Sequence, residues 1–383
     1  MRKKTKIKSK AKLKNQPLAK IKVIGVGGAG GNAVTRMNEG FIKGIDLIAV
    51  NTDIQDLDYT AAKKRIYIGK NLTKGLGTGM DPELGRKAAE ESQAEIAEIL
   101  DGADMVFLTA GFGGGTGTGA LPVVAEIAKD MGILTVAVVT KPFVFEGYER
   151  MRIAEEGIMR TKDRVDTLIT IPNDRIFSII NKNTSLTRAF EEIDEVLKNS
   201  VLGIAELITM PGIINIDFAD VKAIISNAGS ALIGAGIASG NERAINAANL
   251  AINSPLLEIS INGAKRVLFS VSGHRDLKMS EINEIARLIS EQVNSSAKII
   301  FGAHHDRKLK KGELKVTLVA AGFNGELKRE TGILPNLFIS EVLPEKNEIK
   351  EDKDKERKKE NKKEEKEKSD IWEIPTFLRK KKR

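Results

Sequence analysis

The stretch DMVFLTAGFGGGTGTGALPVVAEIAKDMG, residues 104–132, decides the fold of this chain. It begins with an apolar segment of strand length, passes through a turn made almost wholly of Gly and Thr, and ends in a helix-forming run. A helix N-terminus presents unpaired backbone N–H groups and the positive end of the helix dipole, so it attracts phosphate. Glycine lets the backbone approach phosphate oxygens because it has no Cβ. The turn therefore predicts a phosphate-binding loop, with Thr116 and Thr118 as hydroxyl donors.

A second strand, glycine turn and helix come earlier, in the segment IKVIGVGGAGGNAVTRM that starts at Ile21. Further apolar runs at Asp46–Val50, Ile133–Thr140 and Thr167–Pro172 alternate with helical stretches, one of which is Arg86–Leu100. This alternation predicts an α/β fold with a mostly parallel sheet and helices on both faces. Two glycine loops on neighbouring strands would hold a di- or triphosphate from two sides.

The first glycine turn also fits the G-x-G-x-x-G pattern of dinucleotide-binding folds at Gly25, Gly27 and Gly30, and Asp53 follows about 20 residues on. A nicotinamide-dependent oxidoreductase is therefore the alternative function. That fold has no use for the second glycine loop, and the chain has no obvious acid or base for hydride transfer. The P-loop pattern G-x-x-x-x-G-K-[ST] is absent, so backbone amides would hold the phosphates.

Cysteine is absent from the 383 residues, which excludes disulfides and Cys-ligated metal sites. The three histidines, His274, His304 and His305, fall in predicted loops or turns, and we favour a solvated loop over a metal site for the last two. We predict no metal ligands among the side chains. No apolar run has the length of a membrane span, and the N-terminus lacks the apolar stretch of a secretory signal.

The net charge of +9 is concentrated at the two ends of the chain. Residues 1–20 are basic without a single acid, and residues 369–383 are also basic, so residues 21–344 are mildly acidic. A nucleic-acid-binding protein would show its basic residues on the folded core, so we expect no nucleic-acid partner. Residues 345–368 are nearly all charged, which predicts a disordered spacer.

A long helix is predicted over Ser185–Met210, because apolar residues recur along it at three- and four-residue steps. Beyond it, strands at Val267–Gly273 and Leu314–Phe323 and helical stretches around 221–237, 242–253 and 280–291 predict a smaller mixed α/β domain. The predicted organisation is a basic flexible arm (1–20), a nucleotide-binding domain (21–184), a central helix (185–212), a C-terminal α/β domain (213–330), a tail with the charged linker (331–369) and a docking peptide (370–383).

Several motifs in one order resemble the tubulin/FtsZ family of GTPases, and in particular its bacterial cell-division members. They are GVGGAGGNAV (25–34), NTD (51–53), GGGTGTGA (113–120), TKPFVFEG (140–147), IPND (171–174), GIAELITMPG (203–212) and NIDFADV (215–221). SPLLE (254–258) and NGAKRVLFSVSG (262–273) extend the similarity, which covers about residues 20–344. The resemblance implies a GTPase domain, a long central helix and a C-terminal domain.

The resemblance also implies the residues that bind GTP, with Mg²⁺ as cofactor. They are Gly28, Ala29, Gly30, Gly31, Asn32, Gly115, Thr116, Gly117, Glu146, Arg150, Asn173, Phe190 and Asp194. Asn173 and Asp194 match the base-reading positions. A carboxylate can accept from the ring N–H and the exocyclic amine of guanine together, a pair that adenine does not offer. Whether Asp194 or the adjacent Glu195 contacts guanine stays open.

Asn215, Asp217 and Asp220 match the family loop that completes the active site of an adjacent subunit. From the residues alone, Asp217 as a helix N-cap with Asp220 in a capping box is the favoured interpretation. The resemblance instead implies catalytic acids, head-to-tail protofilaments, and GTP turnover that requires contact between subunits. A third possibility is a filament-forming protein that barely hydrolyses GTP; the presence of both acids argues against it.

The final segment DIWEIPTFLR resembles the family's adaptor-binding peptide. The expected partner-binding residues are Ile374, Pro375, Phe377, Leu378 and Arg379. The resemblance implies membrane-tethering adaptors and negative regulators of assembly as partners, beside further copies of the chain. It implies a cytoplasmic location at the mid-cell division ring, beneath the membrane and without a membrane span. The role of the basic arm stays open.

Overall fold

The structure, a computed structural model, describes residues 19–39, 44–181, 183–209, 212–254, 260–306 and 308–323. The predicted basic arm lies outside these ranges except for its last two residues. The charged linker and the docking peptide with Ile374 to Arg379 lie wholly outside them, so these predictions stay predictions. Within the described ranges no helix combines the length and the apolar character needed to cross a membrane.

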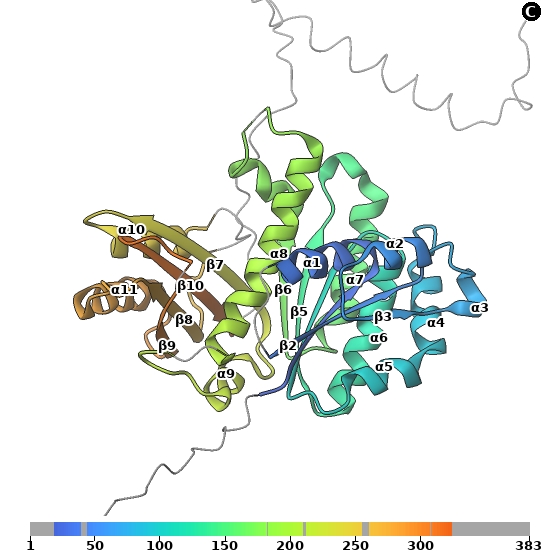
Figure 1. The fold of residues 1–383 in the computed structure, drawn as a ribbon, viewed down its shortest axis with the longest axis horizontal. Coiled ribbons are helices and arrows are strands. Elements are labelled where there is room, and N and C mark those ends of the chain that lie inside the picture. Colours follow the sequence, from blue (N-terminus) through green and yellow to red (C-terminus); the bar gives the residue numbers. More distant parts are fainter. Residues whose placement is uncertain are drawn as a thin grey trace, which may run out of the picture. The chain divides into compact units, whose positions relative to one another are not determined.

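The described residues form a sheet of ten strands (Figure 1) in the order β3-β2-β1-β4-β5-β6-β7-β10-β8-β9. The first six in this order are mutually parallel. They are β1 Ile21–Val26, β2 Ile45–Asn51, β3 Lys64–Tyr67, β4 Met105–Gly111, β5 Leu134–Lys141 and β6 Thr167–Pro172. Most of their residues are buried on both faces, which is why these strands appear in the sequence as continuous apolar runs.

Helices connect the parallel strands and cover both faces, as the alternating sequence predicts. They are α1 Gly27–Glu39, α2 Ile54–Tyr59, α3 Lys70–Thr73, α4 Pro82–Glu91, α5 Gln93–Leu100, α6 Thr116–Asp130 and α7 Tyr148–Lys162, with 3₁₀ turns η1 Val144–Glu146 and η2 Asn173–Ser178. The predicted α/β fold is confirmed. The helix predicted over Arg86–Leu100 is divided at Ser92, whose hydroxyl accepts from the Gly69 N–H at 3.4 Å.

The predicted central helix is α8, Leu186–Thr209, whose apolar stripe is buried at Ile193, Leu197, Val201 and Ile204. The rest of the described chain forms α9 Phe218–Ile225, β7 Gly229–Ser239, α10 Arg243–Ile252, β8 Arg266–Gly273, α11 Met279–Gln292, β9 Lys298–His305 and β10 Glu313–Ala321. β10 pairs antiparallel with β7 and β8, and β8 pairs parallel with β9. This part of the sheet is therefore mixed.

Two predictions in this half are wrong. The helical stretch around 221–237 ends at Ile225, and residues 229–237 belong to β7. Gly234 in that strand faces α10 so closely that a Cβ would lie 2.0 Å from the Ala251 carbonyl oxygen, a contact that local pattern does not reveal. His304 is also not in a solvated loop, because it lies in β9, is 6% exposed, and its Nε2 is 3.0 Å from the Ser272 hydroxyl.

Glycines hold the start of α4 directly on the start of α6. A Cβ on Gly119 would lie 1.9 Å from the Pro82 carbonyl oxygen, and one on Gly85 would lie 2.4 Å from the Gly115 carbonyl oxygen. Both of these Cβ atoms would clash with backbone atoms, which cannot move away as the end of a flexible side chain can. The absence of side chains at these two positions therefore fixes where α4 lies relative to the glycine turn before α6.

We predict that Gly119→Ala destabilises the fold by about 2 kcal/mol. Alanine favours a helix interior over glycine by roughly 1 kcal/mol, but overpacking against backbone costs up to about 3 kcal/mol. Gly114→Ala is the matched control, because a Cβ there meets nothing within 4 Å. It should change stability by less than about 0.5 kcal/mol. Urea unfolding without ligand measures both, and equal midpoints would contradict the packing argument.

Candidate nucleotide site

The two glycine turns meet where the order of the parallel strands reverses. β1 and β4 are neighbours, and the chain leaves them toward opposite edges of the sheet. Open α/β sheets bind ligands at such a point, beside the carboxyl ends of the strands. The turns are in close contact, since a Cβ on Gly27 would lie 3.0 Å from the Gly117 backbone nitrogen. The N-termini of α1 and α6 therefore converge on one place, as phosphate binding requires.

A cavity of about 470 Å³ lies at this point. Of the residues predicted to bind GTP, all but Gly30 and Gly31 line it: Gly28, Ala29, Asn32, Gly115, Thr116, Gly117, Glu146, Arg150, Asn173, Phe190 and Asp194. Gly30 and Gly31 instead allow α1 to pack closely, because a Cβ on Gly30 would lie 2.6 Å from the Thr109 carbonyl oxygen. On Gly31 it would lie 2.9 Å from the Thr60 hydroxyl.

One end of the cavity is suited to a flat, polar ring. Asn173, at the start of η2, is 7% exposed, and its Oδ1 has no hydrogen-bond partner among the described residues. A buried amide oxygen without a donor is costly unless a ligand supplies one. Phe190 on α8 packs edge-on against Phe143, with the two ring centres 5.5 Å apart. Phe190 is 40% exposed, so its apolar surface is available at the cavity.

Asp194 contributes a partly buried carboxylate to the same end. Burial raises its pKa to about 6, although the Arg36 Nε–H donates to its Oδ2 at 3.2 Å and favours the charged form. Arg36 on α1 also pairs with Glu191 at 3.4 Å. The neighbouring Glu195 does not line the cavity and pairs with Lys198 at 2.9 Å. Of the two acids left open by the sequence, the structure therefore places Asp194 at the cavity. No sequence pattern indicates Arg36.

The glycine end of the cavity has further charges and hydroxyls. Arg150 at the start of α7 donates to the Glu146 carboxylate, which also accepts from the Phe143 N–H at 2.9 Å. Thr116 lines the cavity at the first turn of α6. Thr118 differs from the prediction, because it is 2% exposed and its hydroxyl accepts from the Gly113 N–H at 3.0 Å. It supports the glycine loop from behind instead of facing the ligand.

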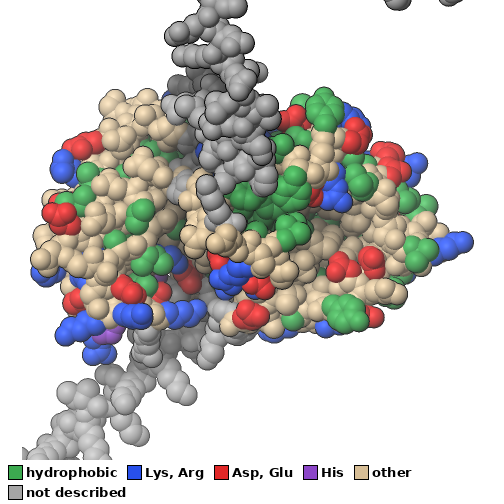
Figure 2. Space-filling model, turned by 90° about the horizontal axis from the view of Figure 1, so that it is seen from above, with side chains coloured by type: hydrophobic (Ala, Val, Ile, Leu, Met, Phe, Trp, Pro, Cys, Tyr) green, Lys and Arg blue, Asp and Glu red, His purple; other side chains and the backbone are tan. Residues whose placement is uncertain are grey.

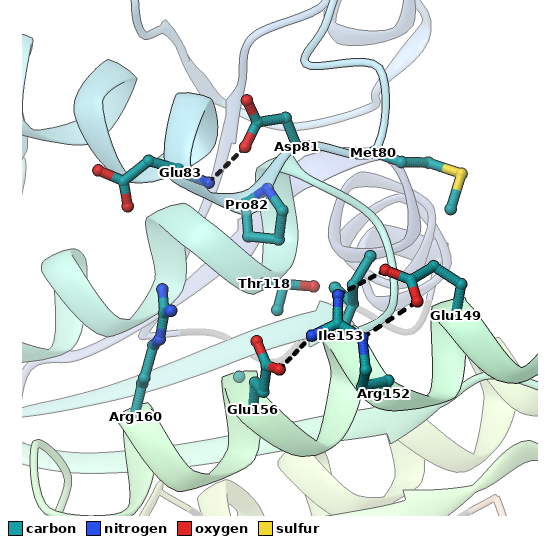
Figure 3. A pocket seen from close by; sticks show the side chains of 11 residues that line it. Met80, Asp81, Pro82, Glu83, Thr118, Glu149, Arg152, Ile153, Glu156 and Arg160 are labelled. Atoms are coloured by element: carbon teal, nitrogen blue, oxygen red, sulfur yellow. Dashed lines mark hydrogen bonds and ion pairs between the residues drawn. The ribbon is translucent and has the colours of Figure 1, made fainter. Parts of the chain in front are cut away.

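Behind that loop a smaller pocket of about 240 Å³ lies between α4 and α7 (Figure 3). Thr118 is part of its lining, and Asp81 caps α4 at its edge by accepting from the Glu83 N–H at 2.8 Å. Figure 3 shows Arg152 bonded to Glu149 and Glu156, so the charges that project from α7 largely satisfy one another. We assign no ligand to this pocket.

The remaining sequence candidates lie away from the cavity. Asp53 caps α2 by accepting from the Gln55 N–H at 2.9 Å and does not line the cavity. Asp217 is the N-cap of α9 and accepts from the Asp220 N–H at 2.8 Å, and Asn215 accepts from the Gly212 N–H at 2.7 Å. Among the described residues no group of three or more His, Cys, Asp or Glu side chains is placed to hold a metal ion.

The segment with Asn215 and Asp217 is attached to the far edge of the sheet. The Ala303 carbonyl oxygen in β9 accepts from the backbone N–H groups of Ile213 at 2.7 Å and Ile214 at 3.0 Å. The Ala303 N–H donates back to the Ile214 carbonyl at 3.1 Å. These bonds fix the position of the acidic segment relative to the last strands of the sheet.

Residues 20–181 match the model of the Tubulin/FtsZ family, GTPase domain, and residues 229–324 match that of the FtsZ family, C-terminal domain. An empty FtsZ dimer from M. jannaschii is 50% identical with a TM-score of 0.76, over 79% of this chain and 88% of that one. The chain belongs to the Tubulin/FtsZ family. It is of FtsZ type, so the predicted resemblance is confirmed. The matched GTPase domain includes most of the cavity lining, and α8 supplies the rest.

Other solved structures agree. A point mutant of M. jannaschii FtsZ is 49% identical with a TM-score of 0.76, over 80% of this chain and 91% of that one. CetZ2 from Haloferax volcanii, solved as a GTPgS-bound protofilament, is 24% identical with a TM-score of 0.68. The match covers 81% of this chain and 95% of that one. At this identity the similarity is evidence for the fold alone.

The alternative function, a nicotinamide-dependent oxidoreductase, is left without support, since Asp53 does not line the cavity.

We predict that affinity for GDP falls about tenfold between pH 7 and pH 5. Asp194 must be charged to accept two N–H groups of guanine, and its pKa of about 6 means that acid protonates it in the free protein. Calorimetric titration of GDP across this range measures the effect. Asp194→Asn is the control, because it keeps the titration of the nucleotide phosphate and removes that of the carboxyl. Identical pH profiles for the two proteins would contradict this role of Asp194.

Proposed function

We propose that the chain hydrolyses GTP within head-to-tail filaments of its own copies. GTP binds in the cavity between α1, α6 and α8, and Asn215, Asp217 and Asp220 of the next copy complete the catalytic site. The filament acts in cell division. The FtsZ type of the chain supports self-association, and the arrangement of the cavity and the acids supports the shared site.

The separation of the cavity from the acids along α8 carries this proposal. Asp194 lies at the cavity, whereas Asp217 and Asp220 follow the other end of the helix. Fifteen residues separate Asp194 from the end of α8 at Thr209, which is roughly 22 Å at about 1.5 Å per residue. Figure 1 shows α9 at the end of α8 opposite to its start. Within one copy the acids cannot reach the ligand, so a second copy must bring them.

The mouth of the cavity has the character of a contact surface. Exposed apolar side chains project from η1, α7 and the start of α8: Val144, Phe145, Tyr148 and Leu186. Figure 2 looks down on the molecule and shows hydrophobic side chains gathered among charged ones on this side. Large exposed apolar groups near polar residues mark surfaces that bind another protein. We assign this surface to the acidic end of a second copy.

Guanine specificity follows from the polar groups at the buried end. Asp194 offers carboxylate oxygens to the ring N–H and the exocyclic amine, and the unpartnered Asn173 Oδ1 is a further acceptor. Adenine presents no matching pair of donors. A site that leaves buried acceptors unpaired rejects the wrong base strongly, which favours GTP over ATP as substrate.

Hydrolysis requires little covalent chemistry from the protein. The helix N-termini and Arg150 offset phosphate charge, and the carboxylates of Asp217 and Asp220 orient the attacking water. Mg²⁺ commonly reaches a protein bound to substrate phosphates and keeps several waters of its own. Mg²⁺ would therefore be held by the phosphates of the bound nucleotide, and Thr116, which lines the cavity, would offer it a hydroxyl oxygen.

The cellular part of the proposal rests on the family. We propose that the filaments build the ring at the division site beneath the membrane, as FtsZ-type proteins do in bacteria. The terminal peptide around Ile374, Phe377 and Leu378 would bind a membrane-tethering adaptor. Negative regulators would act on assembly. The alternative is a filament that binds GTP and barely hydrolyses it. The rate of GTP hydrolysis distinguishes this alternative from the proposed function.

We predict that GTP hydrolysis per subunit nearly vanishes below a threshold protein concentration and becomes constant well above it, in the presence of Mg²⁺. A site shared between copies cannot form in monomers. Phosphate release measured over a concentration series, with light scattering in parallel, tests this. Activity per subunit that is independent of concentration would contradict the shared site. Filaments that scatter light without releasing phosphate would favour the alternative.

We further predict that Asp217→Asn lowers hydrolysis at least 100-fold and leaves GDP affinity unchanged. Asparagine caps a helix as well as aspartate, so α9 keeps its N-terminus while the charge is lost. A mixing experiment supplies the control: Asp217→Asn has an intact cavity, and Asp194→Ala has intact acids. Their mixture should hydrolyse GTP faster than either variant alone. A mixture no faster than the sum of the two would contradict catalysis in trans.

A further inference from the structure

The far edge of the sheet contains a buried histidine that has no role in the function proposed so far. His304 in β9 is 6% exposed, and its two ring nitrogens face serine hydroxyls of the neighbouring strand β8. The Nε2 lies 3.0 Å from the Ser272 Oγ, and the Nδ1 lies 3.4 Å from the Ser270 Oγ. One hydroxyl can donate to the bare ring nitrogen while the other accepts from the N–H. The neutral ring therefore has a partner on each side.

The same face of the sheet carries a lysine. Lys315 of β10 is paired with Ser272, which is paired in turn with His304, so the three side chains project from one face. On α8, the Glu206 Oε2 lies 3.9 Å from the Lys315 Nζ, and both side chains are largely buried. The histidine therefore belongs to a polar layer between the sheet and α8.

This layer disfavours a positive charge on the imidazole. Burial is the main reason why the pKa of His304 lies below its ordinary value. Asp306 raises that pKa, whereas Lys315 and the adjacent His305 lower it. Burial also raises the pKa of the Glu206 carboxyl, so acid removes the negative partner of Lys315.

The residue before His304 anchors the segment that leads to the catalytic acids. Backbone bonds join Ala303 to Ile214, so this segment lies along β9 on its way to α9 (Figure 1). A Cβ on Gly302 would lie 2.8 Å from the Ile216 Cδ1, which shows how closely the two segments pack. Ile216 directly precedes the first acid in the sequence. The bonds between His304 and β8 therefore hold the backbone on which the acidic segment rests.

We propose that His304 is a positioning residue for the acids that each copy supplies to the next, and that protonation of its ring loosens the segment carrying them. The inference rests on the proposed function, because those acids complete a site in a second copy. An imidazolium in this buried place is costly, so the protonated ring draws in water or leaves the serines. The bonds between Ala303 and the acidic segment then weaken, and GTP hydrolysis slows.

Acid is therefore the condition that weakens the anchor. Once released, the histidine has its ordinary pKa of about 6.5, whereas in the anchored state its pKa is lower. The anchored state is fully stabilised above about pH 6.5 and loses this stabilisation as the pH falls below that value. At pH 5.5, one unit below the pKa of the released histidine, the loss is at most about tenfold in the equilibrium.

Hydrogen exchange in the full chain, without nucleotide, tests the anchor. The reporters are the Ile213 and Ile214 amides, which donate to the Ala303 carbonyl oxygen. After correction for the intrinsic effect of pH on exchange, we expect their protection to fall about tenfold between pH 7.5 and pH 5.5. In His304→Gln it should fall less than about twofold, because glutamine takes up no proton and still offers one donor and one acceptor to the serines.

The neighbouring residues provide matched controls. His305→Gln makes the same substitution at the exposed histidine next in the chain, and Glu206→Gln removes the other titrating group of the polar layer. Both should keep the wild-type response to pH. The Phe112 amide, which donates to the Thr140 carbonyl in the parallel part of the sheet, should not respond in any variant. His304→Asn is a second variant that does not titrate, in case glutamine disturbs the fold.

Mixed filaments test the link to catalysis. In a mixture of Asp194→Ala and Asp217→Asn, only the first variant supplies acids and only the second supplies a working cavity. With His304→Gln in the first variant, the loss of rate between pH 7.5 and pH 5.5 should become about tenfold smaller. With His304→Gln in the second variant, the loss should stay as it was. Rates are measured at saturating GTP and divided by the sedimented protein, and titration of Asp194 affects both mixtures equally.

Protection that falls equally in the wild type and in His304→Gln would overturn this inference and leave the proposed function standing. So would mixtures whose pH profiles do not depend on which copy carries His304→Gln. A wild type that hydrolyses no GTP at any concentration would overturn the proposed function, and the role of His304 in catalysis with it.

Discussion

The molecule depends on one constraint: two helix N-termini must come within contact of each other at the point where β1 and β4 leave the sheet. Side chains have little room there, since a Cβ on Gly27 would lie 3.0 Å from the Gly117 backbone nitrogen and one on Gly117 would lie 3.3 Å from the Val26 carbonyl oxygen. The parallel order of the strands directs both helices to this place. Dipoles and free N–H groups that would repel each other in an empty protein become favourable once they share an anion. The fold is therefore arranged around a ligand that carries the negative charge.

The sequence predicts this centre well because its determinants are local. Each glycine turn lies between a strand and a helix of its own segment, so Gly115 and Thr116 are placed by their immediate neighbours. The base end is predicted less directly. Asn173 and Asp194 are 21 positions apart and come from different elements, so only the resemblance to a family predicts that both contact the base. No sequence pattern predicts that Arg36 contacts Asp194.

The errors have a common physical cause, which is that tertiary contacts overrode local preference. β7 is rich in Gly and Ala because α10 packs on it, and such composition does not distinguish strand from helix. His304 in β9 is polar, which suggested a loop, but its ring packs against β8. The Thr116 hydroxyl oxygen lies 2.6 Å from that of Thr52 and 3.2 Å from that of Thr78, and no local pattern connects residues so far apart in the sequence.

The bonds from Ala303 to Ile213 and Ile214 have a consequence for a filament as a whole. They place the acids at one end of each copy, and the cavity opens at the other. In the proposed filament every internal nucleotide therefore receives catalytic acids from a neighbouring copy. The terminal copy at one end has a cavity that no neighbour completes. Its nucleotide outlasts the others, while the opposite end presents acids without a substrate. The two ends are chemically different, so growth and loss of subunits acquire a direction from the fold of a single chain.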